Sequence, residues 1–258
     1  MGERTGYTPG TFCWTDLTTT DQESAKAFYG GLFDWVAEDM PVGDSYYSIQ
    51  RKDGREVAAI SPQPPPQQDA GTPPTWNSYV SVESVDAVAA RATELGATVV
   101  APPFDVMEAG RTAAIQDPQG AHFLVWQPNR HRGAQLVNVP GALSWNELAS
   151  PDLPASSAFY AALFGWTVEP FEGSPEPYLT INNGEVVNGG IRTLGSPGPP
   201  PHWLVYFAVD DLDASLAKVP ELGGATHAGP IDIGIARIAV VADPQGAMFA
   251  LYDGRLDP

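Results

Sequence analysis

The sequence has one cysteine, few basic residues and a large excess of acidic ones. Cys13 stands alone, so no intrachain disulfide can form and nothing calls for an oxidising compartment. Its apolar neighbours predict a small buried residue. Lysine and arginine number 13 against 31 acidic residues, which gives a formal charge of −18. Nucleic acids need a basic face and anionic membranes repel an acidic chain, so we expect neither as a partner.

The chain also lacks long apolar runs. No stretch of about 18 apolar residues is present, so we expect no transmembrane span. Residues 1–10 contain no apolar segment of the kind found in secretory signals, which predicts a cytoplasmic protein. A hydrophobic content of 43% is nevertheless enough for packed cores.

What the sequence does contain is a long internal repeat. The segment from Trp14 to Trp35 returns 131 residues later, from Trp145 to Trp166, with nine of 22 positions identical. Such a repeat indicates a duplicated chain with one structural unit in each half. We therefore expect two domains, at residues 1–130 and 131–258, each near the usual domain size.

Hydrophobic spacing predicts the same element order four times. A branched and aromatic strand is followed by a helix with one apolar face, which in the first case begins at a Thr20–Glu23 capping box, and then by three strands. The four βαβββ modules cover residues 11–62, 75–128, 141–193 and 202–253, and predict an α+β fold. Residues 61–74 are expected to form a stiff, partly polyproline-like linker, and residues 127–141 a solvated one.

Two motifs suggest a family. A-F-Y-x-x-L-F-x-W lies in the first helix of each half, and D-P-Q-G precedes the last strand of each half. With four βαβββ modules, the chain resembles the vicinal oxygen chelate superfamily of glyoxalases, extradiol dioxygenases and bleomycin-resistance proteins. W-x-D-L-x-T-T-D-Q resembles, more closely, a tandem-repeat actinobacterial subgroup that includes a mycobacterial culture-filtrate antigen and proteins near antibiotic gene clusters. The resemblance implies two glyoxalase-like domains whose curved mixed sheets form cup-shaped pockets, with helices outside.

Metal-binding members of that superfamily place His, Glu or Gln ligands on the first and last strands of their modules. The resemblance puts those positions at eight residues, none of which is a strong ligand: Trp14, Ala59, Asn77, Leu124, Trp145, Gly190, Leu204 and Ala250. Asn77 is a weak oxygen donor, and Glu56 would serve only in another strand register. Since a catalytic metal needs about three protein ligands, we expect both cups to be metal-free and to use no cofactor.

Strand alternation predicts what faces the cups instead. If Trp14 and Trp145 point inward, Phe12, Asp16, Leu143 and Glu147 share their faces. Aromatic walls with a few polar groups are typical of small-molecule sites. The residues expected to contact a ligand are Trp14, Asn77, Tyr79, Leu124, Trp126, Trp145, Tyr206, Met248 and Tyr252.

Three titratable residues are candidates for acid or base chemistry: Asp16, Glu147 and His122. A carboxylate beside indole rings can have a raised pKa, although a rim position or a backbone hydrogen bond is favoured for Asp16 and Glu147. A lone histidine such as His122 is more often a packed or surface residue. His122 is mirrored by Met248 in the other half, so the halves are not equivalent. Arg111 and Arg237 occupy matching strand starts, where a salt bridge is favoured over binding of an anion.

These patterns favour metal-independent binding of an aromatic or polycyclic small molecule, in resistance, sequestration or sensing. The alternative is a cofactor-free enzyme of secondary metabolism that uses Asp16, Glu147 or His122; a metal-dependent glyoxalase or dioxygenase is disfavoured. An interaction module with filled cups would lack a small ligand altogether. The sequence leaves open whether modules pair within a half or across halves, and whether the chain is a monomer or a homodimer.

Overall fold

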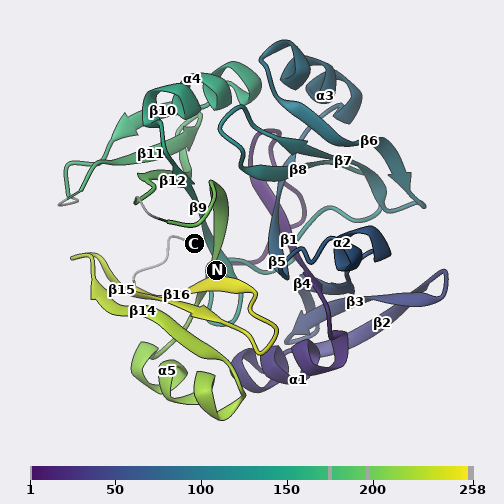
Figure 1. Ribbon diagram of the computed structural model, residues 1–258, viewed down its shortest axis with the longest axis vertical. Helices are drawn as coiled ribbons and strands as arrows, with labels where there is room; N and C mark the ends of the chain where they lie inside the picture. Colours follow the sequence, from purple (N-terminus) through teal and green to yellow (C-terminus); the bar gives the residue numbers. More distant parts are fainter. Residues whose placement is uncertain (1, 174–175, 196–197, 255–258) are drawn as a thin grey trace.

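The chain forms two eight-stranded mixed sheets with the same strand order, as Figure 1 shows for the computed structural model. The structure describes residues 2–173, 176–195 and 198–254. The first sheet runs β2-β3-β4-β1-β5-β8-β7-β6 and the second β10-β11-β12-β9-β13-β16-β15-β14. Each sheet curves, and the long helices lie outside it (Figure 1). The predicted α+β fold of two tandem domains is confirmed.

The order of elements is the predicted one in every module. The first half contains β1 (Phe12–Thr19), α1 (Gln22–Phe33), β2 (Val36–Val42), β3 (Ser45–Lys52), β4 (Arg55–Pro62), α2 (Pro65–Asp69), β5 (Thr75–Ser81), α3 (Val85–Glu94), β6 (Thr98–Val106), β7 (Gly110–Gln116) and β8 (His122–Pro128). The second half contains β9 (Leu143–Ser150), α4 (Leu153–Phe164), β10 (Thr167–Pro170), β11 (Tyr178–Asn183), β12 (Val186–Thr193), β13 (His202–Ala208), α5 (Leu212–Glu221), β14 (Ala225–Asp232), β15 (Ala236–Ala242) and β16 (Met248–Gly254). Among the described helices, none is long and apolar enough to span a bilayer.

Three local expectations were wrong. The side chain that caps α1 belongs to Asp21, which accepts from the Ser24 amide at 3.0 Å, and not to Thr20. Within the proline-rich linker, residues 65–69 form the short helix α2, because a proline at the first helical position is already set for helix. The linker between the halves is not solvated as a whole, since Ala134 donates to the Cys13 carbonyl and Gln135 to the Glu56 carbonyl.

The sheets are built within each half, but the hydrophobic cores are shared across the halves. In each sheet the first strands of two modules pair side by side, β1 with β5 and β9 with β13. One core, in contrast, contains Phe28 of α1 together with Phe207 and Phe249 of the second half. The other combines Phe123 of β8 with helix α4. Both pairings left open by the sequence therefore occur, one in the sheets and one in the cores.

The two sequence motifs are each other's partners across the halves. The Tyr29 hydroxyl of A-F-Y donates to Asp243 of the second D-P-Q-G at 3.2 Å. The Tyr160 hydroxyl donates to Asp117 of the first D-P-Q-G at 2.9 Å. Each aspartate also accepts backbone N–H bonds from its own turn, so it shapes the turn and holds the opposite helix.

The tryptophan that ends each helix motif crosses the halves as well. Trp35 Nε1 donates to the Gly141 carbonyl at 2.7 Å, and Trp166 Nε1 donates to the Gly10 carbonyl at 2.8 Å. Both glycines have positive φ, of 77° and 88°, a conformation that side chains disfavour. The start of each half is thus anchored on the other half's helix.

Candidate functional site

The floor of the first cup is a hydrogen-bond network centred on Asp16. This carboxylate is 5% exposed. It accepts from Asn77 Nδ2 at 2.8 Å, from the Tyr79 hydroxyl at 2.7 Å and from the Tyr47 hydroxyl at 3.1 Å. Burial raises the pKa of the Asp16 carboxyl, while the three donors oppose that rise. The network therefore holds a carboxyl beside neutral donors and no cation.

The first cup is closed by a histidine from the inter-half linker. The ring of His131 lies edge-on against Trp14, with centroids 4.4 Å apart, and 5.7 Å from the ring of Trp126. Its Nδ1 is 3.2 Å from Glu56 Oε2, and its carbonyl accepts from Trp126 Nε1 at 2.9 Å. The hydrogen bond from His131 lowers the pKa of Glu56, and the nearby Arg51 adds to this. Trp14 is only 3% exposed as a result.

The remaining candidates of the first half lie around this network. Leu124 and Trp126 flank it on β8, because Leu124 is the Cα partner of Tyr79. His122 lies exposed at the start of that strand; partial desolvation of its ring lowers its pKa, and the charge of Asp117 opposes this. Phe12 and Leu143 were expected on the cup faces, and both expectations were wrong, because a β-bulge lies next to each of them. A β-bulge between Phe12 and Trp14 turns Phe12 to the other face, where its ring meets Trp203 at 4.9 Å.

The second cup repeats the tryptophan, tyrosine and carboxylate but adds a cation. Trp145 Nε1 donates to the Tyr178 hydroxyl at 3.0 Å, just as Trp14 donates to Tyr47 at 3.0 Å. Glu147 takes the place of Asp16 and pairs with Arg192, with Nε and Oε1 2.8 Å apart. Burial raises the pKa of Tyr178 and of Tyr206, and the charge of Glu147 raises both further.

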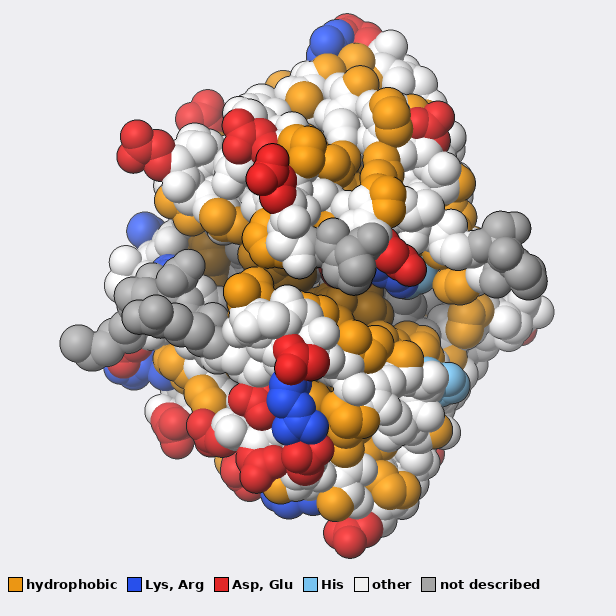
Figure 2. All heavy atoms as spheres, turned by 90° about the vertical axis from the view of Figure 1, so that its left-hand side faces the viewer, with side chains coloured by type: hydrophobic (Ala, Val, Ile, Leu, Met, Phe, Trp, Pro, Cys, Tyr) orange, Lys and Arg blue, Asp and Glu red, His pale blue; other side chains and the backbone are white. Residues whose placement is uncertain are grey.

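The second cup is more open than the first. Trp145 and Tyr252 are partly exposed, whereas their counterparts Trp14 and Trp126 are buried. Tyr178 and its counterpart Tyr47 are both partly exposed. Figure 2 shows this face of the molecule hollowed between β10–β12 and β14–β16, with hydrophobic side chains inside. The buried base of this hollow is formed by Leu204, Tyr206 and Ala250. Met248 is 37% exposed at the mouth, where His122 stands in the first half.

A histidine and an arginine that the sequence interpretation passed over stand at this opening. His202 begins β13 and Arg192 lies on β12, and both are Cα partners of Ala149 on β9. The Nδ1 atom of His202 is 2.9 Å from the Pro200 carbonyl, and burial lowers the pKa of its ring. The second cup thus combines aromatic surface, a buried carboxylate, an arginine and an imidazole.

A metal centre of the superfamily type does not fit the residues of either cup. The expected ligand positions hold the side chains named above, and the strand registers place Ala59 and Gly190 beside Asp16 and Glu147. Glu56 is directed to Arg51 and His131 instead. Within the described part of the chain, no group of three or more His, Cys, Asp or Glu could hold a metal ion.

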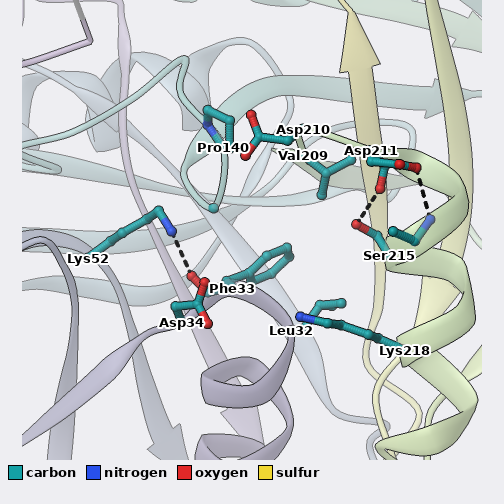
Figure 3. A pocket seen from close by; sticks show the side chains of 12 residues that line it. Leu32, Phe33, Asp34, Lys52, Pro140, Val209, Asp210, Asp211, Ser215 and Lys218 are labelled. Carbon is teal, nitrogen blue, oxygen red and sulfur yellow. Dashed lines mark hydrogen bonds between the residues drawn. The ribbon is translucent and has the colours of Figure 1, made fainter.

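Two clefts lie outside the cups, where helices of the two halves meet. One, of about 180 Å³, is bordered by α1 and α5, and Lys52 and Lys218 enter it from opposite sides (Figure 3). Lys52 Nζ donates to the Phe33 carbonyl there at 3.0 Å. The other, of about 280 Å³, lies between α3 and α4 and is lined largely by apolar residues. Both are consequences of the helix contacts between the halves.

The repeated arginines make salt bridges, as predicted. Arg111 Nε is 2.8 Å from Asp86 and its Nη1 is 2.9 Å from Asp105. Arg237 Nη2 is 2.8 Å from Asp213. The Asp86 and Asp213 pairs each tie a β-strand to the helix of its own module, and the Asp105 pair joins β7 to β6. Cys13 is fully buried and free, also as predicted.

Comparison with known proteins agrees with this architecture. Residues 11–125 match the Glyoxalase/Bleomycin resistance protein/Dioxygenase superfamily, and residues 146–252 match a glyoxalase-like domain. Among solved structures, the Mn(II)-bound glyoxalase of Novosphingobium aromaticivorans has a TM-score of 0.64 at 14% identity, over 98% of this chain and 83% of that one. The 2,3-dioxygenase LapB of Pseudomonas sp. KL28 also has a TM-score of 0.64, at 13% identity, over 96% and 95%. At these identities the likeness concerns the fold.

Relatives at higher identity extend over the full repeat. CFP32 of Mycobacterium tuberculosis, provisionally named a glyoxylase, is 45% identical over 97% of both chains. The anthracycline biosynthesis protein DauV of Streptomyces sp. strain C5 is 34% identical over 97% of this chain and 96% of its own. The chain therefore belongs to the glyoxalase, bleomycin-resistance and dioxygenase superfamily, as a tandem pair of glyoxalase-like domains.

Proposed function

We propose that this protein binds an aromatic or polycyclic small molecule in its second cup and needs no metal to do so. The observation that carries the proposal is the partly exposed wall of Trp145, Tyr178 and Tyr252 around the Glu147–Arg192 pair. Flat aromatic side chains give a large contact area for a flat guest, and the few polar groups fix its orientation. Tyr206 and Met248 belong to the same site, at its base and its mouth.

The first cup supports a structural role better than a ligand site. Its tryptophan at the matching position is covered by His131, and Asp16 already has three hydrogen-bond donors. A guest would have to displace the histidine and break its contact with Glu56. We therefore assign Trp14, Asn77, Tyr79, Leu124 and Trp126 to the closed cup, and ligand binding to the open one.

One relative supports the chemical class of the ligand. The name of DauV places that protein in anthracycline biosynthesis, and anthracyclines are polycyclic aromatic compounds. A role in resistance to, sequestration of or sensing of such a compound needs binding without turnover. One chain supplies both complete sheets, so the site requires no second copy, and the protein would act as a monomer or homodimer.

A fluorescence and melting experiment tests the proposal. Protein treated with a chelator is titrated with polycyclic aromatics such as anthraquinones, and tryptophan emission and the melting temperature are followed. We expect saturable quenching and a rise in melting temperature, since a ligand that binds only the folded state stabilises it. Absence of both effects across such a panel, with and without added divalent metals, would contradict ligand binding. Binding that appears only with metal would contradict metal independence.

A second candidate function is cofactor-free proton transfer at Asp16, on an aromatic ligand that enters the first cup by displacing His131. The observation that favours it is a buried carboxyl whose pKa is raised by burial, the direction that a general acid needs. Under this reading Asp16→Asn abolishes turnover of a bound aromatic while its affinity changes less than about tenfold (~1.4 kcal/mol). Glu147→Gln is the matched change in the other half, and His122→Gln tests the exposed imidazole. Loss of binding without any turnover to lose would rule this function out.

A further inference from the structure

The opening of the second cup holds three chemically complementary groups on three adjacent strands. Arg192 and His202 are the Cα partners of Ala149 from either side of β9. Residues opposite one another in a sheet point to the same face, and neighbouring strands are about 4.8 Å apart. Both side chains therefore lie on the cup side, with α-carbons about 10 Å apart. Glu147 lies two residues deeper on β9 and reaches Arg192.

His202 is set up to accept a proton. Its Nδ1 lies 2.9 Å from the carbonyl of Pro200, and a carbonyl can only accept. The neutral ring therefore carries its proton on Nδ1 and presents a lone pair on Nε2. Burial is the main cause that lowers its pKa, and Arg192 lowers it further while Pro200 and Glu147 oppose this.

Arg192 is set up to meet an anion. Its side chain is 36% exposed, whereas that of Glu147 is 8% exposed. Its Nε binds Glu147, and its Nη1 donates to the Thr193 carbonyl at 3.4 Å. A guanidinium has five N–H donors in a planar fork, so donors remain to serve a ligand oxygen. Tyr178 and Tyr206 are the other titratable groups around Glu147, and burial keeps both protonated.

We propose that the second cup selects aromatic ligands that carry an acidic hydroxyl, a phenol or an enol conjugated to a carbonyl, and binds them as the oxyanion. The ligand O–H bond breaks, its electron pair stays on oxygen, and the proton passes to His202 Nε2. Arg192 then donates to the oxyanion. Two cations, Arg192 and His202, face two anions, Glu147 and the ligand oxygen, so the charges at the opening balance. This proposal rests on the proposed function and specifies its ligand class.

A pair of probes tests it. 2-Hydroxyanthraquinone changes its visible absorption on ionising, and 2-methoxyanthraquinone has the same rings without the acidic proton. Wild-type protein is expected to bind both, and to lower the ionisation midpoint of the bound phenol by about one pH unit, which is tenfold tighter binding of the anion. Arg192→Gln and His202→Gln should remove the shift and leave binding of the ether within twofold.

Control variants remove one arginine and one histidine that lie outside the proposed site. Arg237→Gln deletes a cation that is bound to Asp213 on α5, and His227→Gln deletes an exposed imidazole on β14. Both should keep the shift. An unshifted midpoint in the bound phenol, or a shift that survives Arg192→Gln, would overturn the inference while leaving the proposed function in place. Failure of both probes to bind would contradict the proposed function, and the inference with it.

Discussion

Tyr160 donates a 2.9 Å hydrogen bond to Asp117, and its counterpart Tyr29 donates to Asp243, 214 residues along the chain. All four side chains are buried. Each tyrosine hydroxyl also accepts from a tryptophan indole, Trp203 in one case and Trp76 in the other. The two halves are therefore joined by two copies of one arrangement, built from the most recognisable motifs in the sequence.

Loss of either tyrosine hydroxyl should destabilise the whole chain. Tyr160→Phe leaves the buried Asp117 and the Trp203 N–H each without one partner, and should lower the free energy of unfolding by about 1–3 kcal/mol. Tyr29→Phe should cost a similar amount, and urea denaturation measures both. The two sites share no partner, so the double variant should be additive within about 0.5 kcal/mol. Tyr46→Phe, at an exposed tyrosine, is the control, and an equal loss there would contradict the assignment.

Asp16 should impose a distinctive pH dependence on stability. Its pKa in the folded protein is raised above the ordinary 3.8, so the folded state keeps that proton longer than the unfolded state does. Stability from this group is then present below 3.8 and is lost as pH rises through the folded pKa. Asp16→Asn keeps an acceptor for Asn77 and removes the titration. The unfolding free energy of wild type minus that of the variant should fall with rising pH; a difference that rises would refute the raised pKa.

Trp14 and Trp145 occupy equivalent positions and should respond differently to truncation. Trp14→Ala removes a buried ring that contacts His131, and should destabilise the fold by about 3–5 kcal/mol. Trp145→Ala removes a partly exposed ring and should cost markedly less. Thermal melting of the two variants measures the contrast. Equal losses would mean that both cups are closed alike.

The His131 ring should control access to the first cup. His131→Ala removes the side chain that lies against Trp14 and Trp126, and should expose Trp14 to a neutral quencher such as acrylamide. The loss of packing and of the Glu56 contact should lower stability by about 1–3 kcal/mol. His227→Ala, at an exposed histidine of β14, should change neither property. Unchanged quenching in His131→Ala would show that other groups close this cup.

The internal repeat identifies more residues of the site than strand alternation alone does. Trp14, Asp16 and Tyr47 return as Trp145, Glu147 and Tyr178, always 131 residues later. The shared offset marks the two tyrosines as part of the same unit as the tryptophans and carboxylates, a signal that the sequence interpretation did not use. The elements themselves followed from hydrophobic spacing, because each strand and helix has one face in a core.

Other parts of the site carried no signal of this kind. His131, Arg192 and His202 break the repeat, and their positions depend on contacts between distant strands and a linker. Arg192 stands where the first half has Ser61. This difference between the halves points to position 192, but it does not predict the ion pair with Glu147. The bulge that turns Phe12 away from the cup is a register shift of one residue, which reverses the face of every side chain beyond it. The sequence also contained no sign that the A-F-Y and D-P-Q-G motifs pair across the halves, because one motif lies on a helix and its partner on a turn of the other half.

The central claim is that one cup of the two is an open aromatic site, and calorimetric titration of metal-depleted protein tests it most directly. With 2-methoxyanthraquinone as ligand, we expect saturation near one molecule per chain and at least tenfold weaker binding (~1.4 kcal/mol) in Trp145→Ala. Tyr46→Ala, which removes an exposed aromatic residue of β3 outside the second half, should bind like wild type. Saturation near two, no binding at all, or an affinity that is indifferent to Trp145 would contradict the account.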